Sequence, residues 1–536
     1  MYMTLLVART FKATVVLGLT IHSSSLFAAS QWNIPLNTRT HHEPTTRANP
    51  FNSFFSAATG WNETPIQGGS YGLTGLIKKA LAAIENDNRN SLVADAVVGF
   101  SPERALGDSD SATIKLAQTY KGLEVVGQDT MIHFDRGGVV AQTTNGTINA
   151  ALNVQPSLSS AQALRVLTDR YQQDVQLSEP ATLKVLQDFE GKTRVVYHLL
   201  TSSTPTHDGQ EVYLDAHTGA VVLEFARVYH AHAFDEPKPA PKGGYRTVYS
   251  AKTAAARKSG RVDVSGYPTS TNFDWYDKVF EDNTVDEDAL DRSALNAYRN
   301  SGKVYEYLKK SFDRKSFDDK DTRIKSIVHM GVKMNNALWS SEYNVMIYGD
   351  GDNQILQDLT YGLDVAAHEI THGVINSTAK LVYAAEPGAL NESFADFFGK
   401  MVDYNEDDWL IGARIMAPKT KMRALRNMEI PEEFGQPGDN NSPLRKRTDV
   451  LCSRGNDGCG VHANSGIPNR ASMLVVKAIG KEKAEQLYYR VLTRHLTATS
   501  GFAEMRAETE KACGLMYGAD SADCAGVKAA FDTVKM

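Results

Sequence analysis

The segment Asp364–Val374, DVAAHEITHGV, constrains this chain of 536 residues more than any other part of it. His368 and His372 are four residues apart, so on an α-helix both imidazoles lie on one face, roughly 6 Å apart along the axis. That spacing lets both rings reach one metal ion, and Glu369 is placed to act on a water molecule at the metal. A helix that carries these three residues by coincidence is the alternative.

A second segment, Gly388–Tyr404, supplies a third metal ligand. A zinc hydrolase needs three protein ligands and an open position for water. Glu392 follows His372 by 20 residues (392 − 372 = 20) and begins a predicted helix. Asp396, one turn later, can accept the second N–H of a ligand histidine. For either acid alone, a solvated helix face is the alternative.

The order of predicted elements indicates an α+β, two-lobed catalytic domain. A β-rich half, Tyr245 to about Asp350, contains one helical stretch at Ala294–Phe312, and long helical patterns dominate after it. We expect the cleft near residues 330–400. The predicted helices of the second half are Gly362–Asn376, Asn391–Tyr404, Ala471–Thr493 and Gly501–Met516.

The first 29 residues are predicted to form a signal peptide. Arg9 and Lys12 precede the apolar run Ala13–Phe27, and small residues follow it. This order is typical of secretory signals, whereas a membrane anchor, the alternative, needs about 20 apolar residues. We therefore expect a secreted, extracellular protein with no stable membrane anchor.

Between the signal and the catalytic half, the patterns predict two smaller modules. Residues 114–148 read as an antiparallel meander, and residues 159–225 read as a helix followed by strands. The linker DEPKPAPKGG, Asp235–Gly244, marks a domain boundary and an exposed cleavage region.

All four cysteines lie in the last 85 residues (536 − 451 = 85). Export to an oxidising compartment favours two disulfides, for which three connectivities are possible, and buried free thiols are the alternative. Proximity in the sequence suggests Cys452 with Cys459 and Cys513 with Cys524.

These segments together resemble the thermolysin family of secreted bacterial neutral zinc endopeptidases, whose members include pseudolysin and vibriolysin. The resemblance covers essentially all of Tyr245–Met536 and rests on ordered blocks. The upstream modules resemble the family's propeptide, a fungalysin/thermolysin-type module (30–150) and a PepSY-like module (151–235), before a β-rich lobe (236–365) and an α-helical lobe (366–536). The blocks are NNALW (Asn335–Trp339), GLDVAAHEITHG, GALNESFADFFG, ALRNM (Ala424–Met428) and DGCGVHANSGIPNR (Asp457–Arg470).

The resemblance implies a role for each matching residue. One catalytic zinc ion would be held by His368, His372 and Glu392, and would polarise the scissile carbonyl and acidify its water. Glu369 would be the general base. The residues expected to support the reaction are the oxyanion donors Tyr383 and His462, Asp457 behind His462, and the residues Asp396 and Asn391 behind the ligands.

Substrate would lie as an extended strand against the β-rich lobe. The implied substrate-binding residues are Asn336, Ala337, Trp339, Arg426, Leu359, Val365 and Leu425. The last three are aliphatic and would line the pocket for the residue after the cut, which predicts cleavage before bulky hydrophobic residues. Core packing is the alternative for these three.

Calcium is implied at a group of acidic residues, because oxygen ligands are what this ion requires. The sequence departs from the family's two-calcium pattern, with Leu410 and Ala413 where glutamates are expected. We therefore expect one structural calcium ion, or a solvated acidic patch as the alternative. The expected ligands are Asp364, Asp403, Asp408 and the Leu410 carbonyl, with Glu406 as a further candidate.

The leading hypothesis is a monomeric zinc endopeptidase made as a zymogen, with protein and peptide substrates and its own propeptide as chaperone and inhibitor. Clipping between Phe225 and Gly244 would activate it. A zinc exopeptidase and a catalytically dead binding protein are the alternatives. With 57 Lys and Arg against 63 Asp and Glu, a net charge of −6, nucleic acid is not an expected partner.

Overall fold

The computed structural model of the chain describes residues 98–107, 111–135, 138–144, 152–189, 191–202, 209–226, 246–251, 277–281, 291–341 and 343–536. The predicted signal peptide, the linker Asp235–Gly244 and most of the predicted cleavage region lie outside these residues. Two compact units divide the chain. Unit 1 takes the described residues up to Ser159 with Leu183–Tyr197 and Asp215–Gly219, and unit 2 takes the others.

Unit 1 contains the predicted antiparallel meander, preceded by strand β1, which the sequence did not predict. The neighbouring strands β1 (Val98–Gly107), β2 (Ser111–Tyr120), β3 (Leu123–Asp135) and β4 (Gly138–Thr144) pair antiparallel in chain order. Strand β5 (Thr182–Gln187) runs parallel to β3, with Glu124 opposite Lys184. The β2–β3 turn is Lys121–Gly122, where both residues have positive φ (47° and 86°), as a two-residue hairpin turn requires.

The segment between the meander and the catalytic half has the predicted helix and strands. Helix α4 spans Ser160–Tyr171, and strand β6 spans Thr193–Leu200. Strands β7 (Gln210–Asp215) and β8 (Val221–Ala226) pair antiparallel.

The β-rich part of unit 2 is a five-stranded sheet in the order β10-β9-β11-β13-β12. Strand β11 is parallel to β9 and β13, and the outer pairs are antiparallel. Helix α6 (Arg292–Phe312) packs against β9 and β11 and begins at the cap Asp291, whose carboxylate accepts the Ala294 N–H. The strands are β9 (Arg246–Ser250), β10 (Asp277–Glu281), β11 (Ile324–Met330), β12 (Ala337–Ser340) and β13 (Val345–Gly349).

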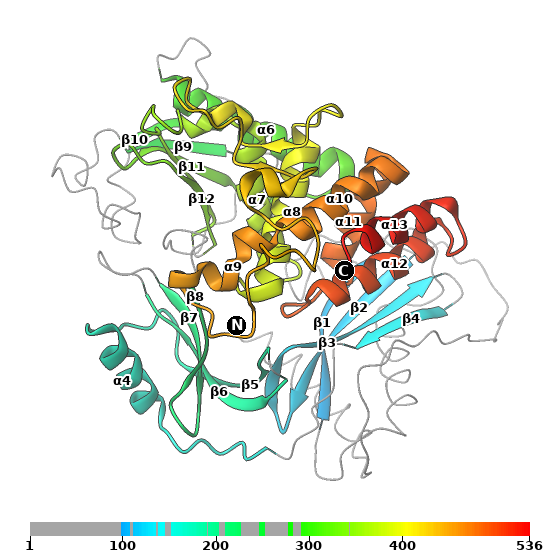
Figure 1. Cartoon of the computed structure of the whole chain (residues 1–536). Helices are drawn as coiled ribbons and strands as arrows, with labels where there is room; N and C mark the ends of the chain where they lie inside the picture. Colours follow the sequence, from blue (N-terminus) through cyan, green and yellow to red (C-terminus); the bar gives the residue numbers. More distant parts are fainter. Residues whose placement is uncertain are drawn as a thin grey trace. The chain divides into compact units, whose positions relative to one another are not determined.

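Helices dominate the rest of unit 2, and in Figure 1 α7 and α8 lie between the sheet and helices α10–α13. Among the described residues, no helix is long and apolar enough to span a bilayer. The helices are α7 (Leu363–Asn376), α8 (Ala385–Val402), α9 (Asp457–Asn464), α10 (Gly466–Ile479), α11 (Lys481–Arg494), α12 (Phe502–Tyr517) and α13 (Ala522–Thr533). Short elements connect them: η3 (Leu359–Tyr361), β14 (Leu410–Ile411), η4 (Ala413–Ile415), β15 (Arg426–Asn427), η5 (Pro431–Phe434) and η6 (Arg454–Asn456).

Two predicted helix boundaries differ from the structure. Helix α8 begins at Ala385, six residues before the predicted start at Asn391, because Pro387 lies in its first turn, where proline is tolerated. The predicted helix Ala471–Thr493 is two helices that meet at Gly480, whose φ of 81° ends the first helix.

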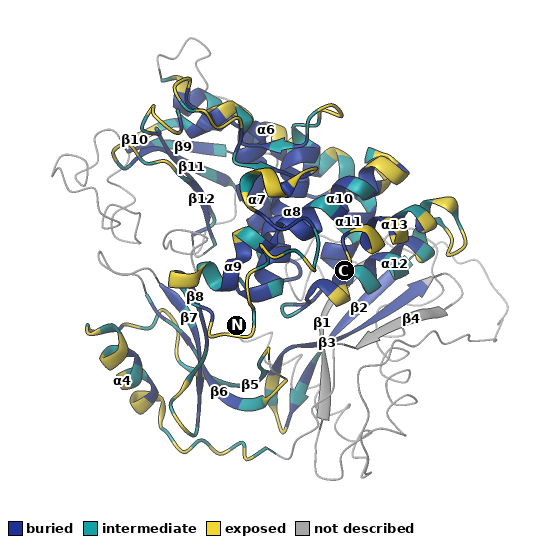
Figure 2. Cartoon of the chain, viewed as in Figure 1, coloured by how far each residue is buried: buried dark blue, intermediate teal, exposed yellow. Residues whose placement is uncertain are grey.

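Helices α7 and α8 are buried almost all round, as Figure 2 shows by their dark blue colour. Two glycines permit this close packing. A Cβ on Gly373 of α7 would lie 2.7 Å from the Trp339 ring, and one on Gly399 of α8 would lie 2.8 Å from the Asp364 carbonyl oxygen. The residues that project between these helices are therefore held on rigid elements.

Both disulfides join the cysteines that are neighbours in the sequence. Cys452 pairs with Cys459 and Cys513 pairs with Cys524, with Cα–Cα distances of 4.9 and 5.7 Å. The second bridge ties α12 to α13.

Candidate metal centre and active site

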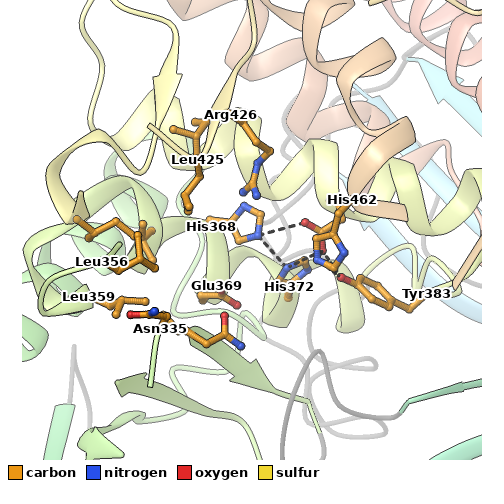
Figure 3. Close-up of a pocket in the computed structure, with 16 residues that line it drawn as sticks. Asn335, Leu356, Leu359, His368, Glu369, His372, Tyr383, Leu425, Arg426 and His462 are labelled. Atoms are coloured by element: carbon orange, nitrogen blue, oxygen red, sulfur yellow. Dashed lines mark hydrogen bonds and ion pairs between the residues drawn. The ribbon is translucent and has the colours of Figure 1, made fainter. Parts of the chain in front are cut away.

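The predicted ligands His368 and His372 of α7 point toward one another in Figure 3, and the predicted ligand Glu392 of α8 lies close to both. The Nε2 atoms of His368 and His372 are 3.2 Å apart. The two carboxylate oxygens of Glu392 lie 3.5 Å from the Nε2 atoms of His368 and His372, one oxygen to each. All three side chains are buried.

Hydrogen bonds behind the histidines fix their tautomers. The His368 Nδ1 lies 2.8 Å from Asp396 Oδ1, and the His372 Nδ1 lies 2.8 Å from Asn391 Oδ1. The Asn391 amide donates to the Leu381 carbonyl, so its oxygen faces the imidazole as acceptor. Each Nδ1 therefore carries the proton, and each Nε2 presents a bare lone pair. Burial lowers the pKa of His372 to about 4, which favours the neutral ring that binds a metal.

Two bare imidazole nitrogens and one carboxylate form the donor set of a catalytic zinc site. Lone pairs this close repel one another unless a cation lies between them. The three residues therefore fit a zinc ion.

Asp396 is the centre of a buried network behind this site. It accepts from His368, from the Nε and Nη2 atoms of Arg426 at 2.7 Å each, and from the Asn469 amide at 2.8 Å. Burial opposes ionisation of Asp396, but the charges of Arg426 and His368 outweigh it and hold the pKa far below its usual range. One carboxylate thus orients both a ligand histidine and an arginine that lines the cleft.

Glu369 lies on α7 beside the convergent atoms and lines the same cleft. Its Oε2 accepts the backbone N–H of Trp339 at 2.9 Å, which orients the carboxylate. Burial raises the pKa of Glu369 to about 7, although the nearby charge of His368 acts in the opposite direction. A carboxyl group that titrates near neutral pH can both accept and return a proton.

Tyr383 and His462 both lie close to the carboxylate of Glu392. The Tyr383 hydroxyl donates to Glu392 and lies 3.1 Å from the His462 Nε2. Asp457 lies 2.6 Å from the His462 Nδ1 and also accepts the His462 backbone N–H. Burial lowers the pKa of His462, but Glu392 and Asp457 outweigh it and raise the pKa to about 9. His462 can therefore act as a cationic donor at neutral pH.

The loop that presents His462 has an unusual backbone. Four successive residues in α9, Asp457, Gly458, Cys459 and Gly460, have φ values of 56°, 56°, 68° and 79°. Positive φ angles strain the backbone of residues other than glycine. Cys459, one such residue in this run, is bridged to Cys452. Two glycines and a disulfide thus hold the turn between Asp457 and His462.

These residues line a cleft of about 230 Å³ in unit 2. Besides the ligands, Glu369, Tyr383 and His462, its lining includes six predicted substrate-binding residues: Asn336, Ala337, Leu359, Val365, Leu425 and Arg426. Four further lining residues were missed by the sequence: Asn335, Leu356, Ile411 and Ile415. Asn335 lies within the quoted NNALW block, so the block itself could have identified it.

The side chain of Trp339 does not have the predicted position. It is fully buried and is not among the residues that line the cleft. Its ring packs on Phe317 and against Gly373 of α7. The Trp339 side chain therefore packs behind helix α7, and its backbone N–H orients the Glu369 carboxylate.

The predicted calcium ligands do not form an obvious cation site. The carboxylates of Asp364, Asp403 and Asp408, all in the described part of the chain, are not grouped within 4.8 Å of one another. Asp364 accepts the backbone N–H groups of Val365 and Gly412.

Comparisons with protein families match three parts of the chain. Residues 232–376 match the model described as thermolysin metallopeptidase, catalytic domain, and residues 379–536 match the thermolysin metallopeptidase, alpha-helical domain. Residues 111–146 match the fungalysin/thermolysin propeptide motif.

Comparisons with individual proteins agree. A bacillolysin of Bacillus subtilis subsp. amylosacchariticus is 36% identical over 374 residues, which are 67% of this chain and 68% of that protein. A bacillolysin of Bacillus amyloliquefaciens is 34% identical over 443 residues, 77% of this chain and 80% of that protein. An extracellular elastase of Staphylococcus epidermidis is 32% identical over 418 residues, 73% of this chain and 78% of that protein. The solved precursor of protealysin, a metalloproteinase from Serratia proteamaculans, matches with 29% identity and a TM-score of 0.45 over 56% of this chain and 90% of that one.

Proposed function

The chain belongs to the thermolysin family of metallopeptidases, and we propose that it is a secreted zymogen whose mature form cleaves peptide bonds with Glu369 as general base. Membership makes it a zinc-dependent metalloendopeptidase with a propeptide. The observation that supports the residue assignment is the convergence of His368, His372 and Glu392 at the base of the cleft that Glu369 also lines.

Zinc held by His368, His372 and Glu392 would acidify a water molecule and polarise the substrate carbonyl. Glu369 would accept a proton from the attacking water molecule as the water oxygen forms its bond to the carbonyl carbon. The same carboxyl group then returns the proton to the amine nitrogen as the C–N bond breaks. Burial raises the pKa of Glu369, which makes its carboxylate a stronger base for the first transfer.

Tyr383 and His462 are proposed to donate hydrogen bonds to the oxygen that gains negative charge during attack. The Tyr383 hydroxyl and the His462 Nε2 are 3.1 Å apart, so both can be directed at one oxygen. Asp457 holds His462 charged and in position. Donors of this kind typically contribute about 10² to 10³ in rate.

The proposed substrate preference is for a bulky hydrophobic residue directly after the cut. Six aliphatic side chains line the cleft: Leu356, Leu359, Val365, Ile411, Ile415 and Leu425. Arg426, fixed by Asp396, would bind the carbonyl of the residue in this pocket. Peptides that differ only in leucine or glycine after the cut test this. Leucine should be favoured at least about tenfold in kcat/KM, and equal cleavage would contradict the assignment.

The proposed life cycle has a signal peptide (1–29), a propeptide that assists folding and inhibits the enzyme (30–235) and a monomeric mature domain of two lobes (236–365 and 366–536). Activation would follow a cut between Phe225 and Gly244. N-terminal sequencing of the secreted enzyme should find a start within this interval. Full activity of the uncut precursor would contradict the inhibitory role.

Calcium is not part of this proposal. The acidic residues predicted for it are in contact with cationic side chains instead, as Asp403 with Arg414 and Asp408 with Lys400.

The central test is the variant Glu369→Gln, which keeps the size of the side chain and removes the base. We expect zinc content to stay at the wild-type level and hydrolysis of a peptide blocked at both ends to fall by about 10² to 10⁴. Glu429→Gln, which removes an exposed carboxylate paired with Lys477, should retain activity.

The outcomes separate the alternatives. Wild-type activity in Glu369→Gln would refute the assigned base. A wild-type protein that cuts only unblocked peptides would be an exopeptidase. A wild-type protein that holds zinc and cuts neither kind of peptide would be a binding protein.

A further inference from the structure

The acidic residues expected to bind calcium, Asp364, Asp403 and Asp408, lie near the side chain of Lys400. Lys400 lies in the last turn of α8, and only 3% of its surface is exposed. Its Nζ atom is 3.9 Å from Asp408 Oδ1. Burial lowers the pKa of Lys400, and the charges of Asp408, Asp364 and Asp403 act against this lowering. The buried ammonium group therefore pairs with Asp408 and lies within electrostatic range of Asp364 and Asp403.

A second cation serves the same group of acids. The Arg414 Nη2 lies 3.4 Å from Asp403 Oδ1. Two side-chain cations thus face three carboxylates, and most of the negative charge is compensated within the chain itself. A divalent cation placed among these acids would be repelled by the ammonium group of Lys400.

The chain also offers fewer carboxylates than the family's two-calcium pattern, and calcium takes six to eight oxygen ligands. Where the resemblance to the family places two further glutamates, this chain has Leu410 and Ala413. Asp364 is also committed to the backbone, because one oxygen accepts the Gly412 N–H at 2.6 Å and the other accepts the Val365 N–H.

The lysine lies where three parts of the catalytic domain meet. Its neighbour Gly399 contacts the backbone of Asp364 at the crossing of α8 and α7. The Asp364 carboxylate accepts the backbone N–H of Gly412, which directly follows β14 (Leu410–Ile411). Ile411 pairs with Arg426 of β15, and both of these residues line the cleft. Neutralising the acids therefore stabilises one wall of the active site.

We propose that the ammonium group of Lys400 takes the place of a structural calcium ion in this chain, holding the Leu410–Gly412 segment against α7 without any divalent cation. The inference concerns the stability of the folded chain and is independent of the catalytic roles proposed above.

The test measures calcium content and thermal unfolding of the full chain after zinc loading in buffer otherwise freed of divalent ions. All proteins carry Glu369→Ala, so that self-digestion does not contribute. Unfolding is followed by circular dichroism with no addition, with 5 mM CaCl₂ and with 5 mM MgCl₂ as the control for ionic strength. This calcium concentration is about fifty times the tightest Kd typical of extracellular calcium-binding modules.

The variant Lys400→Met keeps the apolar stem and removes the charge. Lys477→Gln is the matched control, because Lys477 is an exposed lysine of α10 paired with Glu429.

We expect the protein with Lys400 to contain no stoichiometric calcium and to unfold within about 1 °C of the same temperature in both salts. Lys400→Met should lower the unfolding temperature by about 5 °C or more, since it removes the ammonium charge near the buried Asp364 and the partly exposed Asp408. The control should change the unfolding temperature by less than about 2 °C.

Stoichiometric calcium in the protein with Lys400, or its stabilisation by calcium beyond that by magnesium, would overturn the proposal. So would an unchanged unfolding temperature in Lys400→Met. If Lys400→Met does not fold while Lys477→Gln does, this loss agrees with the proposal, and the calcium measurements on the protein with Lys400 still decide it.

Discussion

The substitution Asp396→Asn tests the network that joins the metal site to the cleft. Asp396 is fully buried, and its two oxygens accept four N–H groups, from His368, Asn469 and two nitrogens of Arg426. Asparagine keeps the size of the side chain but replaces one acceptor with an NH₂ group that faces these donors. It also removes the negative charge opposite Arg426.

The magnitude has two parts, one in stability and one in metal binding. Leaving one partner of a buried ion pair alone costs about 3 to 5 kcal/mol. Because the Arg426 side chain retains 17% exposure, we take the lower end, about 3 kcal/mol. At about 2 to 4 °C per kcal/mol, the unfolding temperature should fall by about 6 to 12 °C. Loss of the carboxylate behind His368 should weaken zinc binding about 10- to 100-fold.

The assay separates these parts with a second variant. Zinc affinity is measured by competition with a chromophoric chelator, and unfolding is followed by circular dichroism at fixed zinc concentration. The double variant Asp396→Asn/Arg426→Gln removes both charges, so it should recover part of the stability. Its zinc affinity should stay low, because His368 still lacks its carboxylate.

Two results would refute this reasoning. If Asp396→Asn binds zinc within about twofold of wild type, the carboxylate does not tune His368. If it unfolds within about 2 °C of wild type, Asp396 does not stabilise the buried charge of Arg426.

Three further predictions follow from the described geometry. Asp457→Asn should lower kcat and move the alkaline limb of its pH profile to lower pH, because Asp457 raises the pKa of His462; an unmoved limb would contradict this. Gly399→Ala should cost about 1 to 3 kcal/mol in urea unfolding, because its Cβ meets the Asp364 backbone, whereas Gly514→Ala, whose Cβ would meet only Ala519 at an ordinary contact distance of 3.5 Å, should cost nothing. Removal of zinc by 1,10-phenanthroline should abolish peptide hydrolysis and added zinc should restore it; activity that survives chelation would refute the metal mechanism.

The arrangement of the metal site was predictable because its signals are local. Two histidines four residues apart must share a helix face. Glu392 and Asp396 are also four residues apart, so they share a face of a second helix. The family resemblance supplied the partners that are distant in sequence, such as His462.

Long-range packing explains what the sequence did not predict. Ile411 enters the cleft because the two-residue strand β14 pairs with β15, and no local pattern predicts such a short pair. Trp339 was expected at the substrate, but the absence of a side chain at Gly373 lets its ring pack beneath α7 instead. Lys400 reads as an ordinary surface lysine of a helix, and only the approach of Asp364, Asp403 and Asp408 makes it a buried cation.

The most direct test of the central claim is a crystal structure of the secreted enzyme with anomalous diffraction recorded above and below the zinc edge. We expect one zinc peak, with the ion bound by the Nε2 atoms of His368 and His372 and a carboxylate oxygen of Glu392 at about 2.0 to 2.2 Å. Zinc bound by other residues, or no zinc peak in the active enzyme, would contradict it.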